Sequence, residues 1–335
     1  MPEFLSLSKE ERQGILSEGG ARMGRLPNVL EKDVWVCWVL DRLFKMPGAL
    51  QMAFKGGTSL SKVYGAIARF SEDIDVTIDY RALTDVDPFG LSNTRKARLR
   101  EELQKLVAKH IESVVYPYFK AALTNDFGEY AASLEIQGED ADQLVVRYPS
   151  AFDSGGGYLA DSVRIEFGGR NVTEPQSRRG ITADLAGEFP EIEFPKADAP
   201  VLHMERTLWE KATLIHVECN REPRENADRL SRHWYDLDRL YVLEAGQLAL
   251  KDHGLLEDVV KHKRVFFPTK FYDGCLSGKL QLVPEGKLRK QLDADFGRMV
   301  GAGMFYIAPP KFDEILGRLS EMQSTINKAR PPRAA

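Results

Sequence analysis

The stretch FKGGTSLSKVYGAIARFSEDIDVTID, residues 54–79, combines three short patterns that predict how the chain folds around it. A short apolar approach ends in Gly56 and Gly57, and an amphipathic segment at 59–68 follows with helical spacing of its apolar residues. From Asp73 onward, apolar residues alternate with polar ones, as is typical of a strand. We therefore expect a strand, a glycine turn, a helix and a second strand, in that order.

This stretch also carries residue types that bind phosphate and metal ions. Glycines at a helix start let backbone N–H groups approach a phosphate closely, and the helix dipole favours the anion. Asp73 and Asp75 are two positions apart on the predicted strand, so their side chains share a face and can hold a divalent cation between them. Fifteen residues separate Gly57 from Asp73, which leaves room for one helix of about ten residues that returns the chain to the same end of the sheet.

Glu166 is the candidate for a third carboxylate, because it lies in a second predicted strand that is able to pair beside the first. An ordinary solvent-facing acid is the open alternative. The glycine turn is not a Walker A loop, because no Gly-Lys-Ser or Gly-Lys-Thr closes it, and it does not match the dinucleotide-binding fingerprint. The patterns therefore indicate phosphoryl transfer on a scaffold other than the P-loop.

Length and composition indicate a globular protein with one large domain or two smaller ones. The chain has 335 residues, of which 43% are hydrophobic and 29% charged. A net charge of −4 argues against a globally basic nucleic-acid binder, although a local basic face is compatible with it. The odd number of widely spaced cysteines argues against a disulfide framework (Cys37, Cys219 and Cys275). The N-terminus is too polar for a signal peptide and no apolar run is long enough to span a membrane, so we expect a cytoplasmic protein with no membrane contact.

Helical and strand patterns predict an N-terminal lobe at 1–200. A capping box at Ser8 and the apolar spacing in 29–44 predict helices before the glycine turn. Residues 94–123 predict one or two charged helices with a break near Pro117. Two later segments alternate like strands around a glycine loop at 153–157, and a segment rich in Gly, Pro and charge is expected to be irregular (strands 144–148 and 162–167; irregular segment 168–200).

A helical C-terminal lobe at 201–330 and a flexible tail at 331–335 are expected to complete the chain. Apolar residues recur there at helical spacing in five segments, at 204–219, 231–246, 255–263, 285–300 and 310–327.

Several polar residues are candidates for the same site, each beside a simpler interpretation. Lys211 either points at triphosphate charge or snorkels from a helix whose other face is apolar. Asp236 lies in a helical start and is suited to the positive end of a helix dipole. His216 and His233 lack ligand spacing, so we expect hydrogen-bonded packing histidines instead of a zinc site. Ser71 either caps a turn or lies beside the metal, where its phosphorylation would repel substrate.

The blocks KGGTSLSKVYG and RFSEDIDV resemble the signature of the AbiEii/AbiGii-type nucleotidyltransferase toxins. Later blocks are similar to one branch of that family, so that the resemblance covers about residues 30–327 (RIEFGGRNVTEP, ERTLWEKATLIH, SRHWYDLDRL and VVKHKRVFFP). The resemblance implies an α+β, polymerase-beta-like fold, with a mixed sheet and flanking helices in the N-terminal lobe and a helical C-terminal lobe. It also implies a toxin of a toxin–antitoxin or phage-defence system that uses Mg²⁺, with Mn²⁺ as an alternative, and a nucleoside triphosphate.

The resemblance also implies roles for individual residues. Catalytic roles fall on Asp73, Asp75, Lys211 and Asp236, nucleotide binding on Gly56, Gly57, Thr58, Ser59 and Ser71, and metal binding on Asp73, Asp75 and Glu166. Where many relatives have Lys-Asp ahead of the Asp-Leu pair, this chain has Arg232 and His233, which puts the local acceptor contacts in question.

The partners implied are a nucleoside triphosphate, a cognate antitoxin encoded nearby and a tRNA, whose 3′ end would receive the nucleotide so that translation is blocked. Basic segments that would contact RNA are 95–100, 178–179, 221–232 and 261–264. Two alternatives stay open. One keeps the chemistry but transfers to a protein or small-molecule hydroxyl, and the other is a non-catalytic nucleotide- or partner-binding module.

Overall fold

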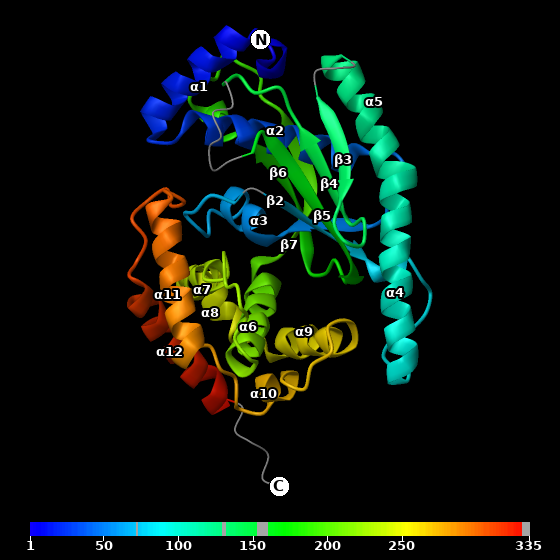
Figure 1. The fold of residues 1–335 in the computed structure, drawn as a ribbon, viewed down its shortest axis with the longest axis vertical. Coiled ribbons are helices and arrows are strands. Elements are labelled where there is room, and N and C mark those ends of the chain that lie inside the picture. The colour runs from blue at the N-terminus through cyan, green and yellow to red at the C-terminus, as the bar shows by residue number, and fades with distance from the viewer. Residues whose placement is uncertain (72, 129–131, 153–159, 330–335) are drawn as a thin grey trace. The chain divides into compact units, whose positions relative to one another are not determined.

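The protein was analysed as a computed structural model, which describes residues 1–71, 73–128, 132–152 and 160–329 (Figure 1). The chain forms two compact units: Met1–Val63, Phe70–Asp87 and Leu91–Leu202 make up unit 1, and Tyr64–Arg69, Pro88–Gly90 and His203–Ala335 make up unit 2. Unit 2 thus takes in two short segments from the first third of the chain. The predicted glycine loop at 153–157 and the predicted tail at 331–335 lie outside the described residues.

Within the described residues, unit 1 is an α+β structure with a seven-stranded mixed sheet, as the fold-class prediction required. The strand order is β3-β4-β5-β2-β1-β7-β6, with β1 at Met52–Lys55, β2 at Asp73–Asp79, β3 at Ser133–Gln137, β4 at Gln143–Arg147, β5 at Ser162–Asn171, β6 at Gln176–Thr182 and β7 at Lys196–Leu202. β2 lies between β1, to which it is antiparallel, and β5, to which it is parallel. The strand with the acidic pair is therefore an inner strand of the sheet.

The alternation in β2 explains why it is an inner strand. Ile74, Val76 and Ile78 are buried, while Asp73 and Asp75 are half-buried on the other face. The predicted helix after the glycine turn is shorter than expected: α3 spans Gly56–Lys62, because the chain leaves the helix before Gly65, which adopts a left-handed backbone.

The N-terminal helices follow the predicted patterns. α1 spans Lys9–Met23 and begins with the predicted capping box, in which Ser8 and Glu11 exchange side-chain and backbone hydrogen bonds. α2 spans Pro27–Lys45 and packs against β7 with a nearly continuous apolar surface.

The long helical segment after the glycine-turn region also agrees with its prediction. α4 at Asn93–His110 passes through a π-helical turn, η3 at Ile111–Val115, into α5 at Tyr116–Phe127. The chain stays helical through the predicted break near Pro117: the π-helical turn precedes the proline, which lies in the first turn of α5.

The prediction that residues 168–200 are irregular was wrong. They contain the end of β5, all of β6, the short helix η4 at Asp184–Gly187 and most of β7. β6 is an edge strand with mostly exposed polar side chains, such as Arg178 and Arg179, so no apolar alternation marks it. β7 contains Pro200, which in a sequence argues against an inner strand.

Unit 2 is helical in its described part. Its helices are α6 at Met204–Asn220, α7 at Arg232–Val242, α8 at Glu244–Ala249, α9 at His253–Phe266, α10 at Tyr272–Leu276, α11 at Gly286–Gly301 and α12 at Phe312–Ala329. α6 packs against α7 and α9, and α7 also packs against α12, around a core that includes Trp209 and Trp234. The helix expected at 231–246 is two helices, since Leu243 is extended and separates α7 from α8. Among the described residues, no helix is both long and apolar enough to cross a membrane.

Candidate functional site

The glycine turn in unit 1 lets an aspartate of β2 lie directly against the backbone. Gly56 has a φ of +80°, and a Cβ at this position would lie 2.6 Å from Cγ and 2.9 Å from Cβ of Asp75. No side chain fits in that space, and L residues rarely adopt such a backbone conformation. Glycine at position 56 is therefore what allows the Asp75 carboxylate to lie over the turn.

The hydroxyl groups of the turn hold its shape. Thr58 Oγ1 donates to the backbone oxygen of Asp73 over 2.6 Å and shares a hydrogen bond with Ser71 Oγ over 3.0 Å. Ser59 Oγ donates to the backbone oxygen of Gly56 over 2.9 Å. Because Thr58 and Ser59 are both buried, these bonds join the turn to the start of β2 and fix the position of Ser71.

Three carboxylates lie on one face of the two neighbouring strands β2 and β5. Asp73 and Asp75 are at alternate positions of β2, and the parallel register places Glu166 directly opposite Asp75. Carboxylate oxygens are the ligands that Mg²⁺ prefers, and the Cβ-less turn leaves room for Asp75, so the donor set fits such an ion. Among the described residues, however, no group of three or more His, Cys, Asp or Glu side chains is arranged to hold a metal. The third-ligand role of Glu166 therefore stays a prediction.

Unit 2 brings the other two predicted site residues together, with a third that the sequence did not single out. Asp236, on α7, accepts hydrogen bonds from Arg69 Nε over 2.7 Å and from a terminal nitrogen of Arg69 over 2.8 Å. Lys211 Nζ, from α6, lies 2.8 Å from Asp236 Oδ2. Exposed fractions are 0% for Asp236, 3% for Arg69 and 9% for Lys211, so two cations share one buried anion.

Burial and charge act in opposite directions on this anion. Burial alone would raise the pKa of Asp236, but the adjacent Arg69 and Lys211 hold that pKa far below its ordinary value. Asp236 is therefore a carboxylate at every physiological pH.

Arg69 is held in place by the backbone of its own segment. The hydroxyl of Tyr235 accepts from the backbone N–H of Ala68 over 3.3 Å, and Tyr306 N donates to the backbone oxygen of Ala68 over 2.9 Å. Arg69 itself forms an isolated antiparallel bridge with Phe305. Sequence reasoning missed Arg69, and the signal that could have found it is its place at the start of the RFSEDIDV block, four residues before Asp73.

His233 lies one helical turn before Asp236, on the same side of α7. Its Nδ1 atom is buried and has no hydrogen-bond partner among the described residues. Burial, followed by the positive charges of Lys211 and Arg232, holds the pKa of His233 well below its ordinary value. The ring is therefore neutral at pH 7, beside a cluster with a net positive charge. His216, by contrast, is a packing residue that hydrogen-bonds the backbone of Phe271 and Gln281.

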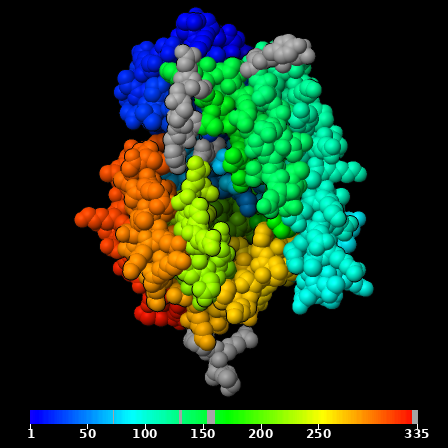
Figure 2. Space-filling model, in the orientation of Figure 1, coloured from blue at the N-terminus to red at the C-terminus, as the bar shows by residue number. Residues whose placement is uncertain are grey.

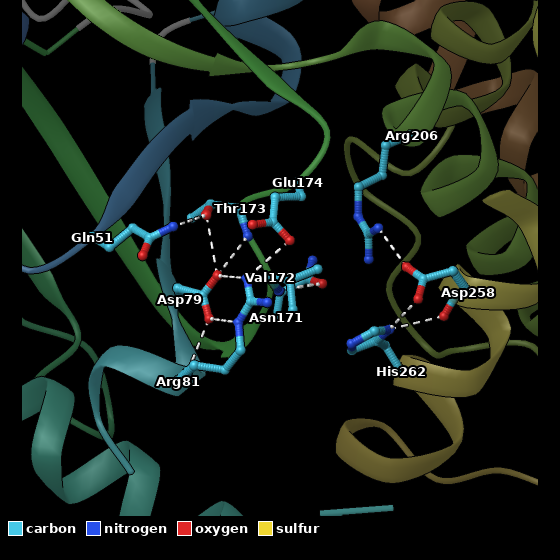
Figure 3. Close-up of polar contacts among 10 residues, drawn as sticks. All are labelled: Gln51, Asp79, Arg81, Asn171, Val172, Thr173, Glu174, Arg206, Asp258 and His262. Atoms are coloured by element: carbon cyan, nitrogen blue, oxygen red, sulfur yellow. Dashed lines mark hydrogen bonds and ion pairs between the residues drawn. The ribbon is translucent and has the colours of Figure 1, made fainter. Parts of the chain in front are cut away.

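Two further polar networks brace the elements that carry these residues (Figure 3). In unit 1, Asp79 ends β2 and accepts hydrogen bonds from Arg81 and from the backbone and side chain of Thr173, whose hydroxyl also accepts from Gln51. In unit 2, Arg206 of α6 donates to Asp258 of α9 over 2.7 Å, and His262 Nδ1 lies 3.3 Å from the same carboxylate. The first network fixes the end of the strand with the acidic pair, and the second fixes the helix with Lys211.

A family model described as "Nucleotidyl transferase AbiEii toxin, Type IV TA system" matches residues 38–318. The chain belongs to the AbiEii family. The match includes the glycine turn, the acidic pair of β2, and the Lys211 and Asp236 helices.

Membership shows that this AbiEii protein is a nucleotidyltransferase toxin of a type IV toxin–antitoxin system. The family predicted from the sequence and the enzyme class are thereby confirmed, and a nucleoside triphosphate substrate and a cognate antitoxin are implied.

No curated protein matches the chain. Among solved structures, it is similar to MenT4, a nucleotidyltransferase toxin from Mycobacterium tuberculosis H37Rv. The identity is 16% and the TM-score 0.46, with 96% of this chain and 90% of that one covered.

Proposed function

We propose that this AbiEii toxin transfers a nucleoside monophosphate from a nucleoside triphosphate to an RNA hydroxyl, at the 3′ end of tRNA, in a Mg²⁺-dependent reaction. The observation that carries the proposal is the close approach of Asp75 to the Cβ-less turn at Gly56, with Asp73 beside it on β2. A turn that accepts phosphate next to paired carboxylates is what nucleotidyl transfer requires.

In this proposal, unit 1 positions the nucleotide. Asp73 and Asp75 would hold the divalent ion, whose chemistry there is neutralisation of phosphate charge. The backbone of the turn at Gly56 and Gly57 approaches the phosphates closely, and the hydroxyls of Thr58 and Ser59 keep that turn rigid. An acceptor hydroxyl would then attack the α-phosphorus in line, so that one P–O bond forms, the bond to pyrophosphate breaks and the hydroxyl proton passes to solvent.

Lys211 is proposed to meet the triphosphate charge. A lysine ammonium has three donors, and within the described residues its ion pair is with Asp236, which leaves donors for phosphate oxygens. Because Asp236 is fully buried, we revise its predicted role: it positions Lys211 and Arg69 and does not touch the acceptor. A lysine held in place before substrate binds loses little freedom in the transition state.

The test supplies each α-labelled nucleoside triphosphate with total RNA and Mg²⁺. Label is expected in a tRNA-sized band with the wild type and not with Asp73→Asn. Asp198→Asn is a matched control, because Asp198 is an exposed aspartate of β7 paired with Arg178 and it leaves the turn untouched. Label in protein would show that the acceptor is a protein hydroxyl, and label in no product would refute transfer to RNA.

A further inference from the structure

α4 presents a stripe of positive charge on its exposed face. Arg95, Arg98, Lys105 and Lys109 are all exposed and follow one another at spacings of three, seven and four residues, so they share one side of the helix. The opposite side is buried, through Leu99, Leu103, Val107 and His110. We call the four cations the α4 stripe; it is about 21 Å long at the rise of an α-helix. In Figure 2 the cyan atoms of this region lie at the surface of the molecule.

The α4 stripe differs from the other basic segments because none of its cations is held in an ion pair within the described residues. Two exposed acids, Glu101 and Glu102, lie one helical turn from Arg98 and Lys105 and, in the part of the chain that the structure describes, pair with none of the four cations. The other segments predicted to contact RNA are partly neutralised: Arg178 pairs with Asp198, Arg224 with Glu218 and Arg264 with Asp273.

The stripe is also unfavourable for the isolated helix. The first turn of α4 holds no acidic residue and has Arg95 in it, close to the positive end of the helix dipole. Arg95 and Arg98 are one helical turn apart and repel each other as well. An anionic partner would relieve both effects.

We propose that the α4 stripe binds the sugar–phosphate backbone of the RNA acceptor. This deepens the proposed function and rests on it for the identity of the RNA. The exposed positions of α4 hold only Asn, Thr, Arg, Glu and Lys, so the face has no apolar or aromatic side chain for a protein interface or for stacking on bases. Contacts of this kind are sequence-independent and position the RNA without reading its bases.

The test compares two variants that remove the same number of charges. In the first, Arg95, Arg98, Lys105 and Lys109 are replaced by Gln, a good helix former. In the control, four exposed cations that each pair with a carboxylate and lie outside the segments predicted to contact RNA are replaced by Gln: Arg22, Lys45, Arg147 and Arg298. Binding of labelled bulk tRNA is measured for both and for the wild type between 50 and 200 mM salt, without nucleotide. Thermal unfolding and binding of nucleoside triphosphate check that each variant is folded.

In the α4 variant, a plot of the logarithm of the tRNA association constant against the logarithm of salt concentration is expected to be less steep by about three. Each phosphate contact adds about 0.7–0.9 to the steepness of that plot, and the variant removes four cations. The control is expected to keep the wild-type slope. A wild-type slope in the α4 variant, or no tRNA binding by the wild type, would overturn the inference, as would loss of antitoxin binding with tRNA binding intact. If the wild type shows the expected slopes but transfers no label to RNA, the proposed function fails while the RNA-binding surface stands.

Discussion

The buried carboxylate of Asp236 offers the sharpest test of how unit 2 holds Lys211. Replacement by Asn keeps the shape of the side chain but removes a charge that lies within 3 Å of both Arg69 and Lys211. Both cations are nearly inaccessible to water. Removal of one partner from a buried ion pair lowers the free energy of unfolding by about 3–5 kcal/mol. Because Asp236 pairs with two cations, we expect Asp236→Asn to fall in the upper part of that range.

The pH dependence of this effect has a definite sign. The pKa of Asp236 is held far below its ordinary value, so the group stabilises the fold at any pH above its unfolded-state pKa. That stabilisation is lost only as the pH falls through the lower, folded-state pKa. The difference between wild type and Asp236→Asn should therefore be constant from about pH 6 to 9 and begin to shrink only below about pH 4.

Urea unfolding at several pH values measures this difference in free energy of unfolding. Asp198→Asn is the control, because its pair with Arg178 spans 2.8 Å at the surface and should be worth less than about 1 kcal/mol. Adding Lys211→Met to Asp236→Asn should recover part of the loss, since a buried cation that pairs with Asp236 in the wild type is then gone. An Asp236→Asn protein within about 1 kcal/mol of wild type at pH 7 would refute the argument that this carboxylate stabilises two buried cations.

Three other substitutions test the remaining site residues. Gly56→Ala should displace the Asp75 carboxylate and abolish transfer. The control Gly24→Ala, at a left-handed position with open space around it, should keep activity and lower the free energy of unfolding by only about 1–2 kcal/mol. Equal activities of the two variants would contradict the close approach of Asp75 to the turn. Glu166→Gln should raise the Mg²⁺ concentration for half-maximal transfer by about 10-fold if the side chain supports the ion, and an unchanged titration would remove it from the site. In the wild type, the free energy of unfolding should fall between pH 7 and 5, because His233 takes up a proton in the unfolded chain but not in the folded one. His233→Asn should reduce that fall by up to about 1.4 kcal/mol per pH unit. Urea midpoints that depend on pH in the same way in both proteins would show that the ring is not held neutral.

Elements with a strong local pattern were predictable. β1, β2, α1 and α2 were expected from apolar spacing and a capping box, and the structure contains all of them. β6 was missed because an exposed edge strand has no apolar alternation, and α3 ends early because Gly65 takes a backbone conformation that spacing does not reveal.

The sequence alone determined the acidic pair on one strand face, the glycine turn before it and, through resemblance, the family. These are local features: strand alternation places Asp73 and Asp75 together whatever the rest of the chain does. Only the tertiary structure showed that Asp236 is a buried anion for Arg69 and Lys211, since Arg69 and Asp236 are 167 positions apart. Neutralisation of a buried charge depends on which distant groups the fold brings within about 3 Å, and no local pattern encodes that distance.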